Sequence, residues 1–311
     1  MIRMQSSWLL ESVEELLQVD SVAIPFFHRF SALNWLSHLE IPLFVNFPVD
    51  SQAMLARAWF DVDKGPFLDK NLHKFNQLLT QPLNKETNPF EPWLDKFFTR
   101  QQIDYIYYWR ESAYEIEDYS QREIFWSAVY QVMSYWLTNK KYRTEVFFEP
   151  DKIMAYYLHY HNEFIRGKQN KVEITSKHLS ELEAKECSLV LFPLIFDDDT
   201  EEDLLQIIYY AWFHGHADIK LAKKEISLAL NRYMIPFNAK SDYSKFLELA
   251  EKAASAAFCW TGKELAPRIH EQVIAEPIRN VFKTGFSKSK LYMKSVDKTT
   301  DTYDYLLVFK K

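Results

Sequence analysis

His214, His216 and Asp218 form a run whose residue types and spacing could hold a metal ion in this 311-residue sequence. Imidazole nitrogens and a carboxylate are ligands of zinc and related divalent metals, and a bound metal can activate water for hydrolysis. Such a site needs further ligands, but the only later histidine is His270. The run also follows a helical pattern over 201–213. We therefore expect a turn at the end of a helix with exposed histidines, and metal-dependent hydrolysis is the weaker alternative.

A second group could contact nucleic acid. Tyr108 lies in an aromatic run between Arg100 and Arg110. Aromatic rings stack on exposed bases and guanidinium groups bind phosphate, so these three residues are candidates for contacts with single strands or with a partner protein. Aromatic residues at helical spacing also form cores, which is the competing structural interpretation.

The scarcity of glycine excludes several classes of enzyme. The chain has five glycines, where average usage of about 7% would give roughly twenty-two. They stand apart from one another, so the sequence contains neither G-x-G-x-x-G nor G-x-x-x-x-G-K. Loops of these types bring the backbone close to phosphates, and their absence argues against kinases, P-loop NTPases and dinucleotide-dependent dehydrogenases.

Charge is distributed unevenly along the chain. The net charge of −6 gives no general attraction to nucleic acid, yet residues 279–311 hold eight lysines and arginines against three aspartates. Any contact with DNA must therefore be local. Lysines near the end of the chain could touch phosphate, although lysines on an edge strand also discourage sheet pairing between molecules. The candidates for phosphate contact are Lys288, Lys290 and Lys294.

Apolar patterning predicts a soluble, cytoplasmic protein that does not enter a membrane. The longest apolar stretch, 188–196, is shorter than the roughly eighteen residues that a membrane span needs, and the first residues show no signal-peptide pattern. Cys187 and Cys259 cannot build a disulfide framework, and we interpret both as buried thiols.

Hydrophobic periodicity predicts an α/β fold interrupted by helices. Strands over 21–27 and 41–47 alternate with helices over 29–39 and 50–60, as in a parallel sheet covered by helices. Long helical patterns fill 65–148, and the alternation then returns. We expect an α/β domain over 1–64 and 149–311 with a helical insertion over 65–148. In the second part we expect strands over 171–174 and 188–196, helices over 179–184, 242–257 and 267–282, and a final antiparallel hairpin of 287–296 and 303–310.

This layout resembles the S-adenosylmethionine-dependent methyltransferases that modify adenine in DNA. Their first strand leads into a loop of the type Asp-Pro-Phe-x-Gly-x-Gly, where glycine lets the cofactor lie against the backbone. Pro25 and Phe26 match that loop, while its acid and glycines correspond to Ile24, His28 and Phe30. At the end of the second strand the family has an Asn-Asp pair, and this sequence has Asn46 followed by Phe47.

The catalytic motif of the family, Asp-Pro-Pro-Tyr, has a degenerate counterpart. It follows an apolar strand, and Phe192, Pro193, Leu194 and Ile195 occupy its positions. In the family, an acidic side chain and backbone oxygens accept hydrogen bonds from the adenine amino group, and an aromatic ring stacks on the flipped base. Phe192 cannot accept a hydrogen bond, and Ile195 has no flat face on which a base could stack. Side chains at His28 and Phe30 would also project where the backbone must approach the cofactor.

The resemblance therefore implies a Rossmann-like methyltransferase sheet without its chemistry. We expect a catalytically inactive protein that binds no cofactor and acts by binding DNA or a partner protein, such as an active methyltransferase or another nucleic-acid enzyme. The helical insertion is the expected binding surface. The alternative is an active DNA adenine methyltransferase with divergent motifs, using S-adenosylmethionine, in which Asn46, Asn34 or an acid of 197–199 replaces the missing groups.

Overall fold

A computed structural model describes residues 19–27, 41–61, 66–67, 88–142, 149–166, 171–194, 204–231, 243–262, 271–297 and 302–311. The chain divides into two compact units, one over 1–53, 170–201 and 228–311 and the other over 54–169 and 202–227. The first contains the sheet and the second is helical. The second unit takes in segments on both sides of the predicted 65–148 insertion.

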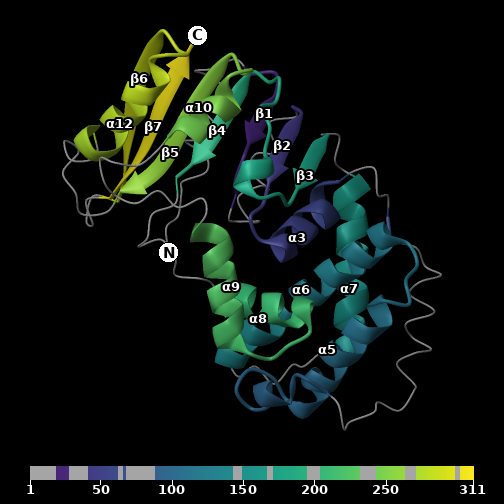
Figure 1. The fold of residues 1–311 in the computed structure, drawn as a ribbon. Helices are drawn as coiled ribbons and strands as arrows, with labels where there is room; N and C mark the ends of the chain where they lie inside the picture. The colour runs from purple at the N-terminus through teal and green to yellow at the C-terminus, as the bar shows by residue number, and fades with distance from the viewer. Residues whose placement is uncertain are drawn as a thin grey trace. The chain divides into compact units, whose positions relative to one another are not determined.

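The sheet unit has a mixed α/β, Rossmann-like architecture (Figure 1). Its seven strands have the order β3-β2-β1-β4-β5-β7-β6. The first five in that order are parallel, and β7 is antiparallel to both of its neighbours. The strands are β1 (Val22–Ile24), β2 (Leu43–Asn46), β3 (Val172–Thr175), β4 (Leu189–Pro193), β5 (Ser255–Gly262), β6 (Lys288–Asp297) and β7 (Thr302–Lys310).

Continuous apolar sequence places β1 and β4 in the middle of the sheet. Every residue of both strands is buried, which is typical of parallel strands covered on both faces. The long strands β6 and β7 confirm the predicted hairpin, with a register shift between Ser295 and Asp297. In Figure 1 they form one side of the sheet, and β3 forms the other.

Two helices pack against one face of the sheet. They are α10 (Ser244–Ala250) and α12 (Glu276–Phe282), the latter preceded by a π-helical turn η7 (Glu271–Ala275). The prediction of a helix over 242–257 is wrong for its last residues, because 255–257 belong to β5. There they pair with both β4 and β7, and this pairing outweighs the helical preference of Ala256 and Ala257.

The predicted helix over 179–184 is also wrong. The connection from β3 to β4 contains only a 3-10 turn, η5 (Leu179–Glu181), whose residues are not buried. An isolated short helix is unstable in water unless it buries an apolar face. Most side chains of residues 181–186 are charged, so a helix here would gain little from packing.

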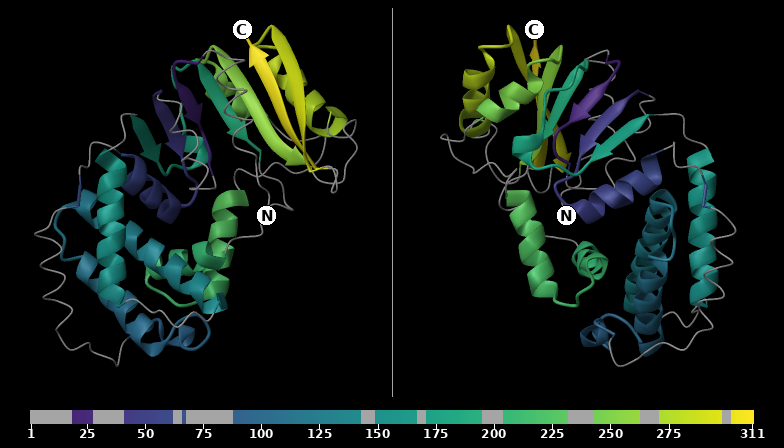
Figure 2. Two further views of the ribbon diagram at one scale, coloured as in Figure 1. Left: turned by 180° about the vertical axis from the view of Figure 1, so that it is seen from behind. Right: turned by 45° about the vertical axis from the view of Figure 1, so that its right-hand side comes forward.

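The helical unit is built mainly from four helices, α5 (Arg100–Ala113), α6 (Tyr119–Tyr142), α7 (Pro150–Arg166) and α8 (Leu204–His214). Figure 2 shows α6 and α7 side by side. One face of α6 is apolar and buried, including Ile124, Val129 and Trp136. A 3-10 turn η4 (Glu91–Trp93) precedes α5, whereas α3 (Asp50–Phe60) and α9 (Ile219–Asn231) each have residues in both units.

Candidate functional site

Phe192, which the resemblance would align with the family's catalytic acid, belongs to the apolar core of the sheet unit. Its side chain has 0% exposure and stacks on Phe258 of β5 at 4.7 Å between ring centroids. The ring of Phe246 from α10 lies at 5.2 Å, and that of Phe282 from α12 at 6.4 Å. Phe26, which follows β1, completes the cluster at 6.3 Å. These five rings are named the phenylalanine cluster below.

The other degenerate motif positions are apolar as well, where the structure describes them. Ile24, Phe47 and Leu194 are buried, and Phe27 contacts Phe47 edge to face at 5.8 Å. Pro25 is half-buried and Pro193 ends β4. The remaining positions, His28, Phe30 and Ile195, lie outside the described residues, as do Asn34 and the acids of 197–199.

Asn46 has a structural role at the end of β2. Its amide is 3% exposed, and Oδ1 accepts from the backbone N–H of Lys177 at 2.7 Å and from Oγ1 of Thr175 at 2.9 Å. Nδ2 donates to the carbonyl of Lys177 at 3.2 Å. Ser176 adds a hydrogen bond to the carbonyl of Phe47 at 3.0 Å. The amide thus fixes the start of the irregular connection from β3 to β4.

A small pocket of about 110 Å³ lies beneath this connection. The described ends of the first three strands reach it through Pro25, Asn46 and Thr175. Its rim carries charged side chains, among them Lys185, which pairs with Glu173 at 2.9 Å. Ligand sites usually enclose about 300–1,000 Å³, so this pocket has room for a small group rather than for a whole nucleoside cofactor. No sequence motif indicated the pocket, because Thr175 and the rim charges belong to none.

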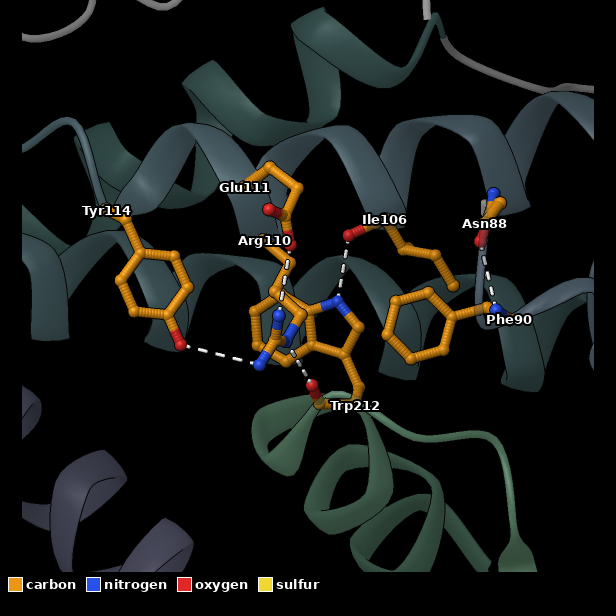
Figure 3. A network of polar contacts seen from close by, with 7 residues as sticks. All are labelled: Asn88, Phe90, Ile106, Arg110, Glu111, Tyr114 and Trp212. Atoms are coloured by element: carbon orange, nitrogen blue, oxygen red, sulfur yellow. Dashed lines mark hydrogen bonds and ion pairs between the residues drawn. The ribbon is translucent and has the colours of Figure 1, made fainter. Parts of the chain in front are cut away.

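Arg110 is held by contacts within the helical unit (Figure 3). Its Nε donates to the carbonyl of Trp212 at 2.9 Å, and Trp212 donates its indole N–H to the carbonyl of Ile106 at 2.8 Å. The guanidinium group also pairs with Glu111 at 3.0 Å and lies over the ring of Tyr114. These bonds join α5 to the end of α8.

The neighbours predicted with Arg110 have separate roles. Tyr108 is 8% exposed and belongs to the core of the helical unit. Arg100 is exposed and forms an ion pair with Glu91. The structure therefore does not gather Arg100, Tyr108 and Arg110 into one exposed group. Their contact with nucleic acid stays a prediction.

His214 ends α8, and His216 and Asp218 lie in the turn before α9, as the sequence predicts. His214 is exposed as expected, whereas His216 is half-buried. Gly215 has a φ of +77°, and the carboxylate of Asp218 accepts from the backbone N–H groups of Lys220 and Leu221, so it caps α9. Nε2 of His216 is 3.8 Å from a carboxylate oxygen of Glu225. Within the described ranges, no group of three or more histidine, cysteine or acidic side chains has a metal-binding arrangement.

Cys259 is buried, as predicted, whereas Cys187 is half-buried. Burial raises the pKa of the Cys187 thiol to about 11, and Cys259, fully buried in β5, also has a raised pKa because of burial and the nearby Asp304. A thiol must lose its proton to attack, so both side chains stay inert.

Lys288 and Lys290 lie exposed on β6, with Lys294 further along the same strand. Lys288 stands directly opposite Lys310 of β7, which was not among the predicted contacts although the hairpin register brings it there. The ammonium group of Lys290 lies 4.6 Å from the ring centroid of Tyr292.

Comparison with known proteins found no match to the chain, either among protein-family models or among curated proteins. None of the helices in the described ranges is long and apolar enough to cross a membrane.

Proposed function

We propose that the chain is a catalytically inactive relative of DNA adenine methyltransferases that acts by binding DNA or a partner protein. The sheet supports the fold part of this proposal. Its order β3-β2-β1-β4-β5-β7-β6, with the antiparallel β7 inserted between β5 and β6, is typical of S-adenosylmethionine-dependent methyltransferases. The terminal hairpin is also the feature on which the resemblance of the sequence rests.

The phenylalanine cluster carries the functional part of the proposal. Transfer of a methyl group to adenine needs an acceptor that orients the amino nitrogen, and the residue at that position is a phenyl ring with 0% exposure. Four other rings surround it, so no substrate atom can reach this position without displacing core side chains. Apolar replacement of polar site residues is expected in a protein released from catalytic demands.

Calorimetric titration with S-adenosylmethionine tests the proposal. We expect no heat of binding at concentrations where an active DNA adenine methyltransferase, titrated in parallel, binds the cofactor. A transfer assay with radiolabelled cofactor and unmethylated DNA should give no product. Binding in the micromolar range would overturn the proposal.

One observation favours the alternative of an active enzyme. The surviving family residues Pro25 and Asn46 both line the pocket of about 110 Å³. If this pocket belonged to an active site, methyl transfer would be measurable and Asn46→Ala would abolish it. Glu183→Gln, on the rim of the same pocket, provides a control that leaves the bonds of Asn46 intact.

The binding partner can be identified without assuming in advance what it is. Co-purification of the protein from its native host, followed by mass spectrometry, would show whether it associates with a methyltransferase or another nucleic-acid enzyme. Nuclease treatment before the purification separates direct protein contacts from association through DNA. If neither a protein nor DNA is enriched relative to an unrelated bait, the binding function is wrong.

A further inference from the structure

The pocket beneath the connection from β3 to β4 lies entirely within the sheet unit, and its walls are fixed. Asn46 holds the start of the connection, and Nζ of Lys245 donates to the carbonyl of Leu182 at 3.3 Å in its middle. Near its end, Lys185 pairs with Glu173 of β3 at 2.9 Å. The connection is thus irregular in structure but tied down along its length, as binding loops on a rigid scaffold usually are.

The apolar part of the lining suits a short aliphatic chain. It includes Phe44 of β2, Leu182 of the connection and Leu249 of α10. The volume of about 110 Å³ equals that of about four water molecules in the liquid, at about 30 Å³ each. The unbranched methylene stem of a lysine is a chain of this size, and such stems commonly lie along apolar surface while the charged end stays in water.

One carboxylate at the rim has no partner among the residues that the structure describes. It belongs to Glu183, which is exposed. Glu173 and Lys185 neutralise each other, and Lys177 takes part in another interaction. The segment 172–187 contains four glutamates and two lysines, so its net charge is −2 with histidine neutral. A cation is therefore the complementary ligand for this rim.

The same rim shows how an ammonium group is bound here. Nζ of Lys185 lies 5.2 Å from the ring centroid of Phe44 and 2.9 Å from Oε1 of Glu173. A carboxylate and an aromatic face thus act on one cation together. Glu183 can act on a second ammonium group in the way that Glu173 acts on the first.

We infer that this pocket binds a lysine side chain of a partner protein, with the methylene stem against the apolar lining and the ammonium group at Glu183. The inference rests on the proposed binding function, because it names what the partner presents. Lysine fits better than arginine, since a compact ammonium group pairs with a single carboxylate, whereas a guanidinium group is suited to bidentate contacts. The binding surface is then on the sheet unit rather than on the helical insertion.

Titration with two short peptides tests this inference. One peptide has a single lysine between alanines and blocked termini, and the other has norleucine in place of the lysine, which keeps the stem and removes the ammonium group. NMR spectra of protein labelled at leucine methyl groups report binding at Leu182 and Leu249. We expect saturable shifts with a Kd on the order of 1 mM for the lysine peptide and at least threefold weaker binding of the norleucine peptide.

Three variants separate the pocket from the general charge of the surface. Glu183→Gln, which leaves the bonds of Asn46 intact, should weaken binding of the lysine peptide about threefold to fivefold. Glu186→Gln removes the same charge from an exposed position of the same connection outside the pocket lining, and it should leave the affinity unchanged. Lys185→Met frees Glu173 and removes a like charge from the rim, so binding should strengthen about twofold or more.

Several results would overturn the inference. These are equal affinities for the two peptides, equal losses in Glu183→Gln and Glu186→Gln, and a lysine peptide that shifts neither leucine. Tighter binding of free n-butylammonium than of the lysine peptide would assign the pocket to a small amine instead of a protein. Cofactor binding in the calorimetric titration would refute catalytic inactivity but leave the peptide result unchanged, so the two proposals fail separately.

Discussion

Replacement of Phe192 by alanine should destabilise the sheet unit strongly. The side chain is completely buried, and four rings have centroids within 6.4 Å of its own. Truncation of a buried phenylalanine costs about 3–5 kcal/mol, and aromatic pairs add about 0.5–1.5 kcal/mol each beyond burial. We therefore expect the upper part of the first range. For a domain of this size, such a loss lowers the melting temperature by on the order of 10 °C.

Phe44→Ala is the matched control. Phe44 lies on β2 of the same sheet but is only half-buried, beneath the ammonium group of Lys185 at 5.2 Å. Its truncation removes less buried area and should cost about 1–2 kcal/mol. Circular dichroism gives the melting temperatures, and hydrogen exchange of peptides from β4 and β5 locates the loss in the sheet unit. Equal effects of the two truncations would refute the assignment of Phe192 to the core.

Phe192→Asp separates the core from a latent catalytic site. It introduces the acid of the family motif, but the carboxylate would stand among the four rings that now surround Phe192. A buried, unpaired charge costs more than a cavity. We expect lower stability than for Phe192→Ala and no methyl transfer. A variant with wild-type stability that gains cofactor binding would show that the position is open to a substrate.

Three further predictions concern other parts of the chain. Arg110→Ala should lower stability by about 1–2 kcal/mol in a thermal or urea titration, because the carbonyl of Trp212 loses one of its two donors and keeps the backbone N–H of Gly215, whereas Arg100→Ala, which breaks an exposed ion pair, should change it little. Gly215→Ala should cost about 1 kcal/mol or more in the same titration, since φ is +77° and a Cβ would lie 2.5 Å from Nη2 of Arg110. Burial raises the pKa of the Cys187 thiol from 9.0 to about 11, so the folded protein holds this proton more tightly than the unfolded chain does. The free energy of unfolding should therefore fall as the pH rises from 9 to 11, and the melting temperature over this range should fall less in Cys187→Ala.

Local patterns predicted most of the strands. The continuous apolar sequence placed a strand over 188–196, where β4 spans Leu189–Pro193, and the two strands of the terminal hairpin lie within one residue of their predicted bounds. The helix α3 has the predicted bounds, Asp50–Phe60, because an N-terminal aspartate and an apolar stripe act on the same segment. These elements depend on neighbouring residues and on burial, which a sequence displays directly.

The errors fall where distant segments decide the local structure. Residues 255–257 become strand because β4 and β7 lie on either side of them, and these strands are separated from them by more than forty residues. The helix α9 was not predicted, although Asp218 caps its start and its buried residues Ala222, Ile226 and Leu230 recur every four residues. Likewise, the hydrogen bond from Arg110 to Trp212 spans 102 residues and has no counterpart in any local pattern.

At the candidate site, too, local sequence predicts single residues but not the distant residues that pack around them. The resemblance predicts a phenylalanine in place of a catalytic acid at Phe192, but it did not predict the rings from α10 and α12 that surround this side chain. These rings add a structural role to the proposed loss of chemistry. A residue that packs between two helices and two strands cannot be replaced by an acid without loss of the core.

The phenylalanine cluster therefore limits where the protein can act. Once the end of β4 serves as core, selection for binding can work only on surfaces whose side chains are not required for packing. Arg110 and Tyr108 are required in this sense, because each is held inside the helical unit. Lys288, Lys290 and Arg100 are exposed, and the core does not require their side chains. Of the candidate residues that the structure describes, these are the ones that selection for binding could change without loss of packing.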